Sequence, residues 1–271
     1  MSQGLMKGKR GIIMGVANDA SIAWAIAQAL HQEGAEIAFT YPNDAIYKRV
    51  SALASTMRPD SLVLKCDVSQ DDDIPNVFKQ VQSRWDSIDF VLHAIAFSDR
   101  HQLTGRYINT SRDNFLNTMN VSCYSLTEIC KEASNIMQNG GSILALTYLG
   151  ANRVIPHYNV MGVAKAALEA SVRYLAADLG AQNIRVNAIS SGAVRTAASS
   201  GIGDFHYIMN WNKNNSPLRR NVSVDEIGKS GLYMLSDLSS AVTGDVHYVD
   251  CGYNIIGMKA VDAPDIEIDK S

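Results

Sequence analysis

The chain alternates between short apolar runs and longer stretches with helical periodicity. Runs of five to eight mainly apolar residues predict buried strands, and apolar residues three or four apart predict helices that pack on one side. The predicted strands are residues 10–14, 36–40, 62–66, 88–95, 142–147, 183–189 and 245–249. The predicted helices are residues 21–30, 71–85, 111–137, 158–180 and 223–235. This alternation predicts an α/β fold, a doubly wound parallel sheet of about seven strands with helices on both faces.

In a sheet of this Rossmann-like kind, ligands bind in the crevice beyond the carboxyl ends of the strands. Five residues of chemical or conformational interest fall at or just past those predicted ends: Gly15, Asp67, Ile95, Tyr148 and Gly192. We therefore expect the binding and catalytic groups to gather at this edge of the sheet.

The first strand and helix are joined by a turn of small residues that begins at Gly15 and ends at Ser21, a candidate N-cap. Free N–H groups at a helix N-terminus bind phosphate, so the turn is a candidate phosphate cradle. Only Gly15 remains of the glycine-rich pattern of dinucleotide-binding turns. An ordinary strand–helix turn explains the stretch equally well.

The ends of the second and third strands bear on the choice of cofactor. In dinucleotide-binding units an acid near the end of the second strand holds the adenosine ribose, and a cation accommodates a 2′-phosphate. Residues 41–44 place neither directly at the strand end, which favours NADH over NADPH, although they are also ordinary turn residues. Asp67, after the third strand, either accepts from an adenine amino group or caps the next helix.

The stretch from Tyr148 to Lys165 holds the most chemistry. Tyr148 ends the fifth predicted strand, and Tyr158 begins a helix after Pro156. Lys165 follows Tyr158 by seven residues, about two helical turns, so both lie on one face and the lysine leans back toward the phenol. A nearby cation favours a phenolate, so we expect Tyr158 to donate a proton more readily than a free tyrosine and to stabilise charge on a carbonyl oxygen. Taken alone, this spacing of two common residues is usually without function.

Composition excludes several other classes of function. The 271 residues, 46% hydrophobic and 19% charged, suit a single dinucleotide-binding and catalytic domain over residues 1–271. The net charge of −3 gives no sign of a nucleic-acid partner. The four cysteines lack metal-ligand spacing, so we expect no metal. The polar N-terminus and the lack of a long apolar run predict a cytoplasmic protein without membrane attachment.

Two segments have less regular patterns. Residues 197–216 mix Ala, Ser, Gly and Asn with aromatic residues and show no clean helix. A mobile apolar flap beside a substrate pocket has this composition, and so does a surface excursion with a structural role. The acidic tail from about residue 261 is expected to be loosely ordered.

These motifs together resemble the short-chain dehydrogenase/reductase family, and within it the divergent branch of bacterial enoyl-[acyl-carrier-protein] reductases. The resemblance extends over residues 9–258 and includes Asp67-Val68, His93 to Phe97, the Tyr148…Tyr158-x6-Lys165 pattern, Gly192 to Thr196 and Ser216 to Arg220. Ordinary short-chain carbonyl reductases instead resemble a Ser…Tyr-x3-Lys pattern. Ala145 and Gly162 occupy the corresponding positions here, and neither matches.

The resemblance implies reduction by NADH of the trans-2 double bond of an enoyl thioester on acyl carrier protein, in a homotetramer. It implies that Lys165 holds the nicotinamide ribose, that Tyr158 donates to the thioester carbonyl, and that Tyr148 shapes the acyl pocket. The implied cofactor contacts are Gly15, Ser21, Ile22, Asp67, Val68, Ile95, Lys165, Val194 and Thr196. The implied substrate contacts are Ala96, Phe97, Tyr148, Tyr158, Phe205 and Met209.

The chain departs from the family pattern at Pro42, at Ala193 and at Cys251, where many relatives have a polar or basic residue, a proline and a glycine. Residues 203–206 also lack the lysines of some relatives, so the sequence does not assign the surface that docks the carrier protein. Two other functions share this fold: a carbonyl or alcohol dehydrogenase, and a dinucleotide-binding sensor without catalysis.

Overall fold

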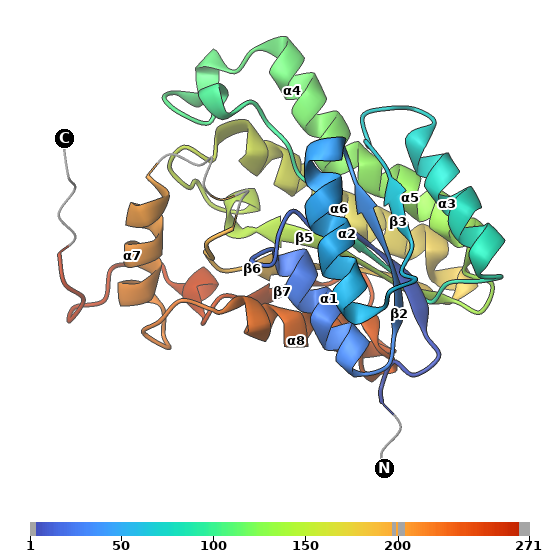
Figure 1. The fold of residues 1–271 in the computed structure, drawn as a ribbon. Coiled ribbons are helices and arrows are strands. Elements are labelled where there is room, and N and C mark those ends of the chain that lie inside the picture. Colours follow the sequence, from blue (N-terminus) through green and yellow to red (C-terminus); the bar gives the residue numbers. More distant parts are fainter. Residues whose placement is uncertain (1–3, 197–198, 200–203, 266–271) are drawn as a thin grey trace.

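Seven strands form one parallel sheet in the order β3-β2-β1-β4-β5-β6-β7 in a computed structural model, which describes residues 4–196, 199 and 204–265 (Figure 1). The strands are β1 Arg10–Met14, β2 Glu36–Tyr41, β3 Val63–Lys65, β4 Phe90–His93, β5 Gly141–Tyr148, β6 Ile184–Ser191 and β7 Val246–Val249. Each pair of neighbours runs parallel. The predicted doubly wound sheet is confirmed, and each strand lies within two residues of its predicted bounds.

Helices cover both faces of the sheet. They are α1 Ile22–Gln32, α2 Asp44–Met57, α3 Asp73–Arg84, α4 Arg112–Met119, α5 Ser125–Ile136, α6 Asn159–Leu179, α7 Phe205–Asn215 and α8 Val224–Leu235. A π-helical turn, Asn120–Tyr124, joins α4 to α5, so the predicted long helix is nearly continuous. A capping box between Ser223 and Glu226 begins α8.

The helix α2 was not predicted. Its N-cap is Asn43, whose side chain accepts a hydrogen bond from the Ile46 N–H, so the polar turn after β2 also starts a helix. Only Val50 and Ala54 of α2 are buried. Ile46, Leu53 and Met57 are partly buried and pack against the same core, so α2 has an apolar stripe at helical spacing that the prediction overlooked.

The prediction that residues 197–216 contain no clean helix is wrong for the described part, where α7 occupies Phe205–Asn215. The buried residues of α7 are Ile208, Asn212 and Asn215, which share one helical face. Two of the three are asparagines, so the apolar pattern breaks although the helix does not. Residues 197–198 and 200–203 of the predicted flap, and 266–271 of the predicted tail, lie outside the described residues.

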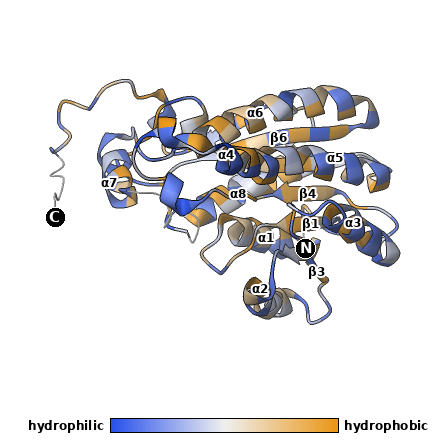
Figure 2. Ribbon diagram, turned by 90° about the horizontal axis from the view of Figure 1, so that it is seen from above, coloured by the Kyte–Doolittle hydropathy of each residue, from blue (hydrophilic) through white to orange (hydrophobic). Residues whose placement is uncertain are grey.

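Two hydrophobic cores lie on opposite faces of the sheet. One contains Phe78 of α3, Ile129 of α5 and Leu168 of α6, and the other contains Ile26 of α1 and Ile227 of α8. Figure 2 shows apolar positions concentrated on the strands and on the sides of the helices that pack against them. Because the strands are buried on both faces, they need continuous apolar runs, which is why the sequence pattern located them well.

The helices α1 and α8 approach each other closely at two glycines. A Cβ atom on Gly228 would lie 2.8 Å from the backbone oxygen of Ala25, and one on Gly231 would lie 2.6 Å from Cγ1 of Ile26. Side chains at these positions would push the helices apart. The contact therefore sets the position of α1, whose N-terminus lies at the carboxyl end of β1.

We expect Gly228→Ala to lower the free energy of unfolding by about 1–3 kcal/mol, because backbone atoms must separate to admit the methyl group. Gly180→Ala is the matched control, since Gly180 has an ordinary helical φ of −57° and no atom within 4 Å of the added Cβ. That change should be neutral or stabilising by up to about 1 kcal/mol. Urea denaturation of both variants measures the difference, and equal effects would contradict the close contact.

Candidate active site

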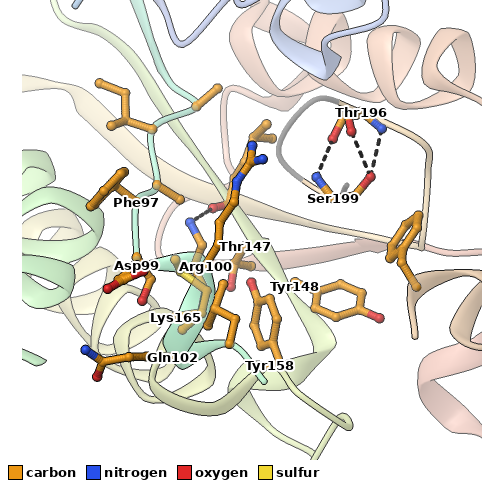
Figure 3. Close-up of a pocket in the computed structure, with 18 of the residues that line it drawn as sticks. Phe97, Asp99, Arg100, Gln102, Thr147, Tyr148, Tyr158, Lys165, Thr196 and Ser199 are labelled. Atoms are coloured by element: carbon orange, nitrogen blue, oxygen red, sulfur yellow. Dashed lines mark hydrogen bonds between the residues drawn. The ribbon is translucent and has the colours of Figure 1, made fainter. Parts of the chain in front are cut away.

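A cavity of about 910 Å³ opens at the carboxyl ends of the strands (Figure 3). Its walls come from the start of α1, the loop after β4, the end of β5, the first turns of α6, the segment after β6 and the start of α7. Ten of the fifteen predicted cofactor and substrate contacts line it: Ile22, Ile95, Ala96, Phe97, Tyr148, Tyr158, Lys165, Val194, Thr196 and Phe205. Gly15, Ser21, Asp67, Val68 and Met209 do not line this cavity.

The turn after β1 is held in shape by Gly15 and Ser21. Gly15 has a left-handed φ of +102°, and a Cβ there would lie 2.1 Å from the Ala94 backbone oxygen. Ser21 occupies the N-cap position, but its Oγ accepts from the N–H groups of Ala17 and Asn18, both at 3.1 Å, rather than from α1. The predicted N-cap position of Ser21 is confirmed, and its side chain orders the turn before the helix.

The start of α1 keeps backbone donors available for a ligand. The N–H groups of Trp24 and Ala25 bond to the Ser21 carbonyl. Those of Ile22 and Ala23 make no hydrogen bond within the part of the chain that the structure describes. Ile22 lines the cavity, so these donors lie where an anion could reach them.

Asp67 does not cap the next helix, whose N-cap is Asp72, so the second of the two alternatives for Asp67 is excluded. Its Oδ1 accepts from the N–H of Ser69 at 3.0 Å and from the Ser69 hydroxyl at 2.7 Å. The helix α3 begins only at Asp73, whose carboxylate accepts from the Asp67 N–H. Val68 is buried in the core beside α3. A contact of Asp67 or Val68 with adenine stays a prediction.

Tyr148 and Tyr158 form one aromatic unit. Tyr148 is the last residue of β5 and Tyr158 immediately precedes α6. Their ring centroids are 5.0 Å apart and their planes meet at 72°, an edge-on arrangement that aromatic rings favour. Gly150 lies against the Tyr158 ring, where a Cβ would come within 2.3 Å of it. Figure 3 shows the Tyr158 hydroxyl directed toward the space beside Lys165 and Arg100.

The expectation that Lys165 makes Tyr158 more acidic is wrong. Burial raises the pKa of the Tyr158 phenol well above its usual value, and Tyr148 and Glu169 raise it further. Burial likewise raises the pKa of Tyr148. Desolvation dominates both shifts, so both phenols stay protonated at neutral pH. Tyr158 is a neutral hydrogen-bond donor in this structure.

The amine of Lys165 is also buried. Its Nζ donates to the backbone oxygen of Leu146 at 2.8 Å (Figure 3). Burial lowers the pKa of Lys165 to about 8, against the opposing influence of Cys123 and Glu169. The ammonium therefore exists at neutral pH and is lost under mildly alkaline conditions.

Sequence reasoning missed two residues near the site. Glu169, 5% exposed, lies four residues after Lys165 on the same face of α6, a spacing that could have revealed it. Arg100, in the loop after β4, lines the cavity and projects into it (Figure 3). Its guanidinium group makes no hydrogen bond or ion pair with other described residues, although its backbone oxygen accepts from the Leu103 N–H at 3.1 Å. No local pattern marks Arg100 in the sequence.

The segment after β6 and the helix α7 close another side of the cavity. The N–H of Thr196 donates to Oγ of Ser199 at 2.8 Å, and the N–H of Ser199 donates to Oγ1 of Thr196 at 3.1 Å. Phe205, the first residue of α7, lines the cavity, whereas Met209 lies outside its lining. The predicted contact of Met209 with substrate stays a prediction.

Two kinds of feature are lacking from the described ranges 4–196, 199 and 204–265. No helix there is both long and apolar enough to cross a membrane. No group of three or more His, Cys, Asp or Glu side chains is placed to hold a metal ion.

We expect the buried Tyr158 phenol to make folding less stable at high pH. A pKa raised in the folded state leaves its stability contribution intact below the unfolded pKa, about 10, and removes it as the pH rises further. Above about pH 10, the free energy of unfolding of Tyr158→Phe should fall less steeply than that of the wild type, by up to ~1.4 kcal/mol per pH unit. Urea denaturation across this range measures the slopes, with Tyr174→Phe, a change at a residue 78% exposed, as control. Parallel slopes for Tyr158→Phe and wild type would contradict the assignment.

Comparison with known proteins places this site in a family. The model of the enoyl-(acyl carrier protein) reductase family matches residues 15–254. The enoyl-[acyl-carrier-protein] reductase [NADH] 1 of Rhizobium meliloti is 61% identical over 98% of each chain. A reductase from Anaplasma phagocytophilum, solved in complex with NAD, is 56% identical, with a TM-score of 0.92 over 98% of this chain and 99% of that one. FabI from Candidatus Liberibacter asiaticus is 52% identical, with a TM-score of 0.93 over 96% of this chain and 100% of that one. With its paired tyrosines and buried lysine at the strand ends, the chain belongs to the enoyl-(acyl carrier protein) reductase family.

Proposed function

We propose that this protein is an enoyl-[acyl-carrier-protein] reductase, which uses NADH to reduce the trans-2 double bond of an enoyl thioester in the last step of the type II fatty acid elongation cycle. The observation that carries the proposal is the combination of a protonated phenol, Tyr158, with a buried ammonium, Lys165, on one large cavity at the strand ends. The family membership supports the same reaction.

The residues present fit a nicotinamide dinucleotide. The free N–H groups of Ile22 and Ala23 suit a diphosphate, and Gly15 lets the turn pass close to the loop after β4. Lys165 is suited to bind ribose hydroxyls, because among the described residues its ammonium donates only to the Leu146 carbonyl and keeps further N–H donors for a ligand. Val194 and Thr196 line the side of the cavity beyond β6. When bound, the nicotinamide supplies the hydride for the β-carbon of the enoyl thioester.

Tyr158 stabilises the charge that develops on the thioester oxygen. Conjugate reduction moves electrons from the double bond to that oxygen, and a neutral phenol can donate to it without first losing its own proton. In a buried site such a donor contributes about 10²–10³ in rate. Tyr148 packs edge-on against Tyr158 and shapes the space for the acyl chain, together with Phe97 and Phe205.

Two positions argue against a carbonyl or alcohol dehydrogenase on this fold. Ala145, where such enzymes have a serine, is fully buried in the core, so a hydroxyl there would not face the cavity. Gly162, where they have the lysine, faces the backbone oxygen of Gly150, and a Cβ would lie 2.8 Å from it. A non-catalytic sensor would not need Tyr148, Tyr158 and Lys165 together.

The proposal includes a carrier-bound substrate, a homotetramer and a cytoplasmic location. The tetramer is supported by large apolar side chains exposed along α4 to α6, which an assembly would cover: Leu116, Tyr124, Val163 and Tyr174. The cytoplasm is supported by the four cysteines, all free, as in proteins of a reducing compartment.

Oxidation of NADH in the presence of a trans-2-enoyl thioester tests the proposed reaction. We expect turnover with the unsaturated thioester and none with the saturated one, and faster turnover with NADH than with NADPH. A simple ketone and an alcohol with NAD are the comparison substrates. Tight NADH binding without turnover of any of them would replace the reductase by a sensor.

Tyr158→Phe should lower kcat by about 10²–10³ and leave KM within a few-fold, because the lost hydrogen bond strengthens only as charge develops. Tyr207→Phe, at a tyrosine of α7 outside the cavity lining, is the control and should leave both constants near their original values. Steady-state kinetics distinguish the effects. An unchanged kcat in Tyr158→Phe would remove this residue from the mechanism.

A further inference from the structure

The helix α6 brings two buried charges against consecutive residues of β5. The Lys165 ammonium donates to the backbone oxygen of Leu146 at 2.8 Å. The Glu169 carboxylate accepts from the Thr147 hydroxyl at 2.8 Å. The next residue of the strand is Tyr148. The helix α6 is therefore hydrogen-bonded to the two residues of β5 that immediately precede Tyr148. Figure 3 shows Thr147 and Tyr148 next to the Lys165 bond.

Within the described part of the chain, only neutral groups donate hydrogen bonds to the Glu169 carboxylate. Its second oxygen accepts from Nδ2 of Asn152 at 2.9 Å, and Asn152 also donates to the Tyr248 hydroxyl at 3.2 Å. No ion pair within 4.0 Å involves Glu169 among the described residues, although its side chain is 5% exposed. A buried charge without a direct counter-ion is costly, so its position calls for an explanation.

The electrostatic partner of Glu169 is Lys165, one helical turn away on α6. Glu169 opposes the effect of burial on Lys165 and so favours the ammonium. His93 of β4 also faces Lys165, and burial, with Lys165 next, lowers its pKa to about 3, so it stays neutral. Another titratable neighbour is Cys123 on the π-helical turn, which, like Glu169, opposes the lowering of the Lys165 pKa by burial. The others are Tyr158 and Tyr248, whose pKa values are raised by burial and also by Glu169.

We propose that Glu169 is a positioning residue of the reductase: it keeps Lys165 in the ammonium form that holds the cofactor, and through Thr147 it fixes the end of β5 that presents Tyr148. This inference rests on the proposed function, because it gives Lys165 the task of binding NADH. Glu169 itself does not line the cavity and acts through Lys165 and Thr147.

The dissociation constant of NADH, measured by fluorescence as a function of pH, tests the electrostatic part. In the wild type, binding should weaken as the pH rises through about 8, where free Lys165 loses its proton. Glu169→Gln removes the negative charge and should move this transition down by about one pH unit or more. Its affinity should approach that of the wild type at low pH, whereas Lys165→Ala should bind weakly at every pH.

A pair of changes at Thr147 tests the positioning part. Thr147→Val removes the hydroxyl and should lower kcat about tenfold, the effect of one lost hydrogen bond to a charged group. Thr147→Ser keeps the hydroxyl and should restore most of the loss. Ser142→Ala is the matched control, because Ser142 lies on the same strand and donates a buried hydrogen bond of equal length, 2.8 Å, to the Met234 carbonyl. It should cost stability and leave kcat unchanged.

An NADH transition at the same pH in Glu169→Gln and wild type would overturn the electrostatic role. Equal kcat values for Thr147→Val and Ser142→Ala would overturn the positioning role, and this comparison decides the matter if Glu169→Gln does not fold. NADH affinity is measured without substrate, so this result does not depend on whether the proposed reaction is correct. A wild type that binds NADH but reduces no enoyl thioester would refute the reaction and leave the pH test intact.

Discussion

The removal of water from the first two turns of α6 is the constraint on which the site depends. Tyr158 and Lys165 are 7% and 5% exposed, and desolvation acts on both by disfavouring their charged forms. For the phenol this yields a neutral donor, which an oxyanion requires. For the amine it lowers the pKa to about 8, an effect that Cys123 and Glu169 oppose. Lys165 also donates to the Leu146 carbonyl, so the chemistry of the cavity depends on contacts behind it.

The sheet could be predicted from the sequence because one burial rule applies to all its strands. Parallel strands covered by helices on both faces must be apolar throughout, and turns between them fall at a common edge. That rule located Tyr148 and Tyr158 at the cavity without any knowledge of distances. It did not locate α2, although Ile46, Val50 and Leu53 recur there at helical spacing. It also missed α7, whose buried face carries Asn212 and Asn215 beside Ile208; the Asn215 side chain donates to the Trp211 carbonyl at 2.9 Å.

The errors within the site share one cause. Spacing along a helix tells which residues share a face, but not what those residues meet across the gap to another element. Hence Lys165 was placed correctly on the face of Tyr158, while its true acceptor on β5 and its partner Glu169 were not foreseen. The attraction between charges is visible in a sequence and desolvation is not, which is why the direction of the pKa shift of Tyr158 was predicted wrongly.

The glycine contact between α1 and α8 has a consequence for the energetics of ligand capture. At Gly228 and Gly231 the helix α8 lies directly against the backbone of Ala25 and the side chain of Ile26, and this close packing restricts the position of α1 on the sheet. The amide groups at its N-terminus are consequently preorganised before any ligand arrives. Association then forfeits little conformational entropy at this end of the cavity. The contact between α1 and α8 thus contributes to the affinity for an anionic group, although the ligand does not touch it.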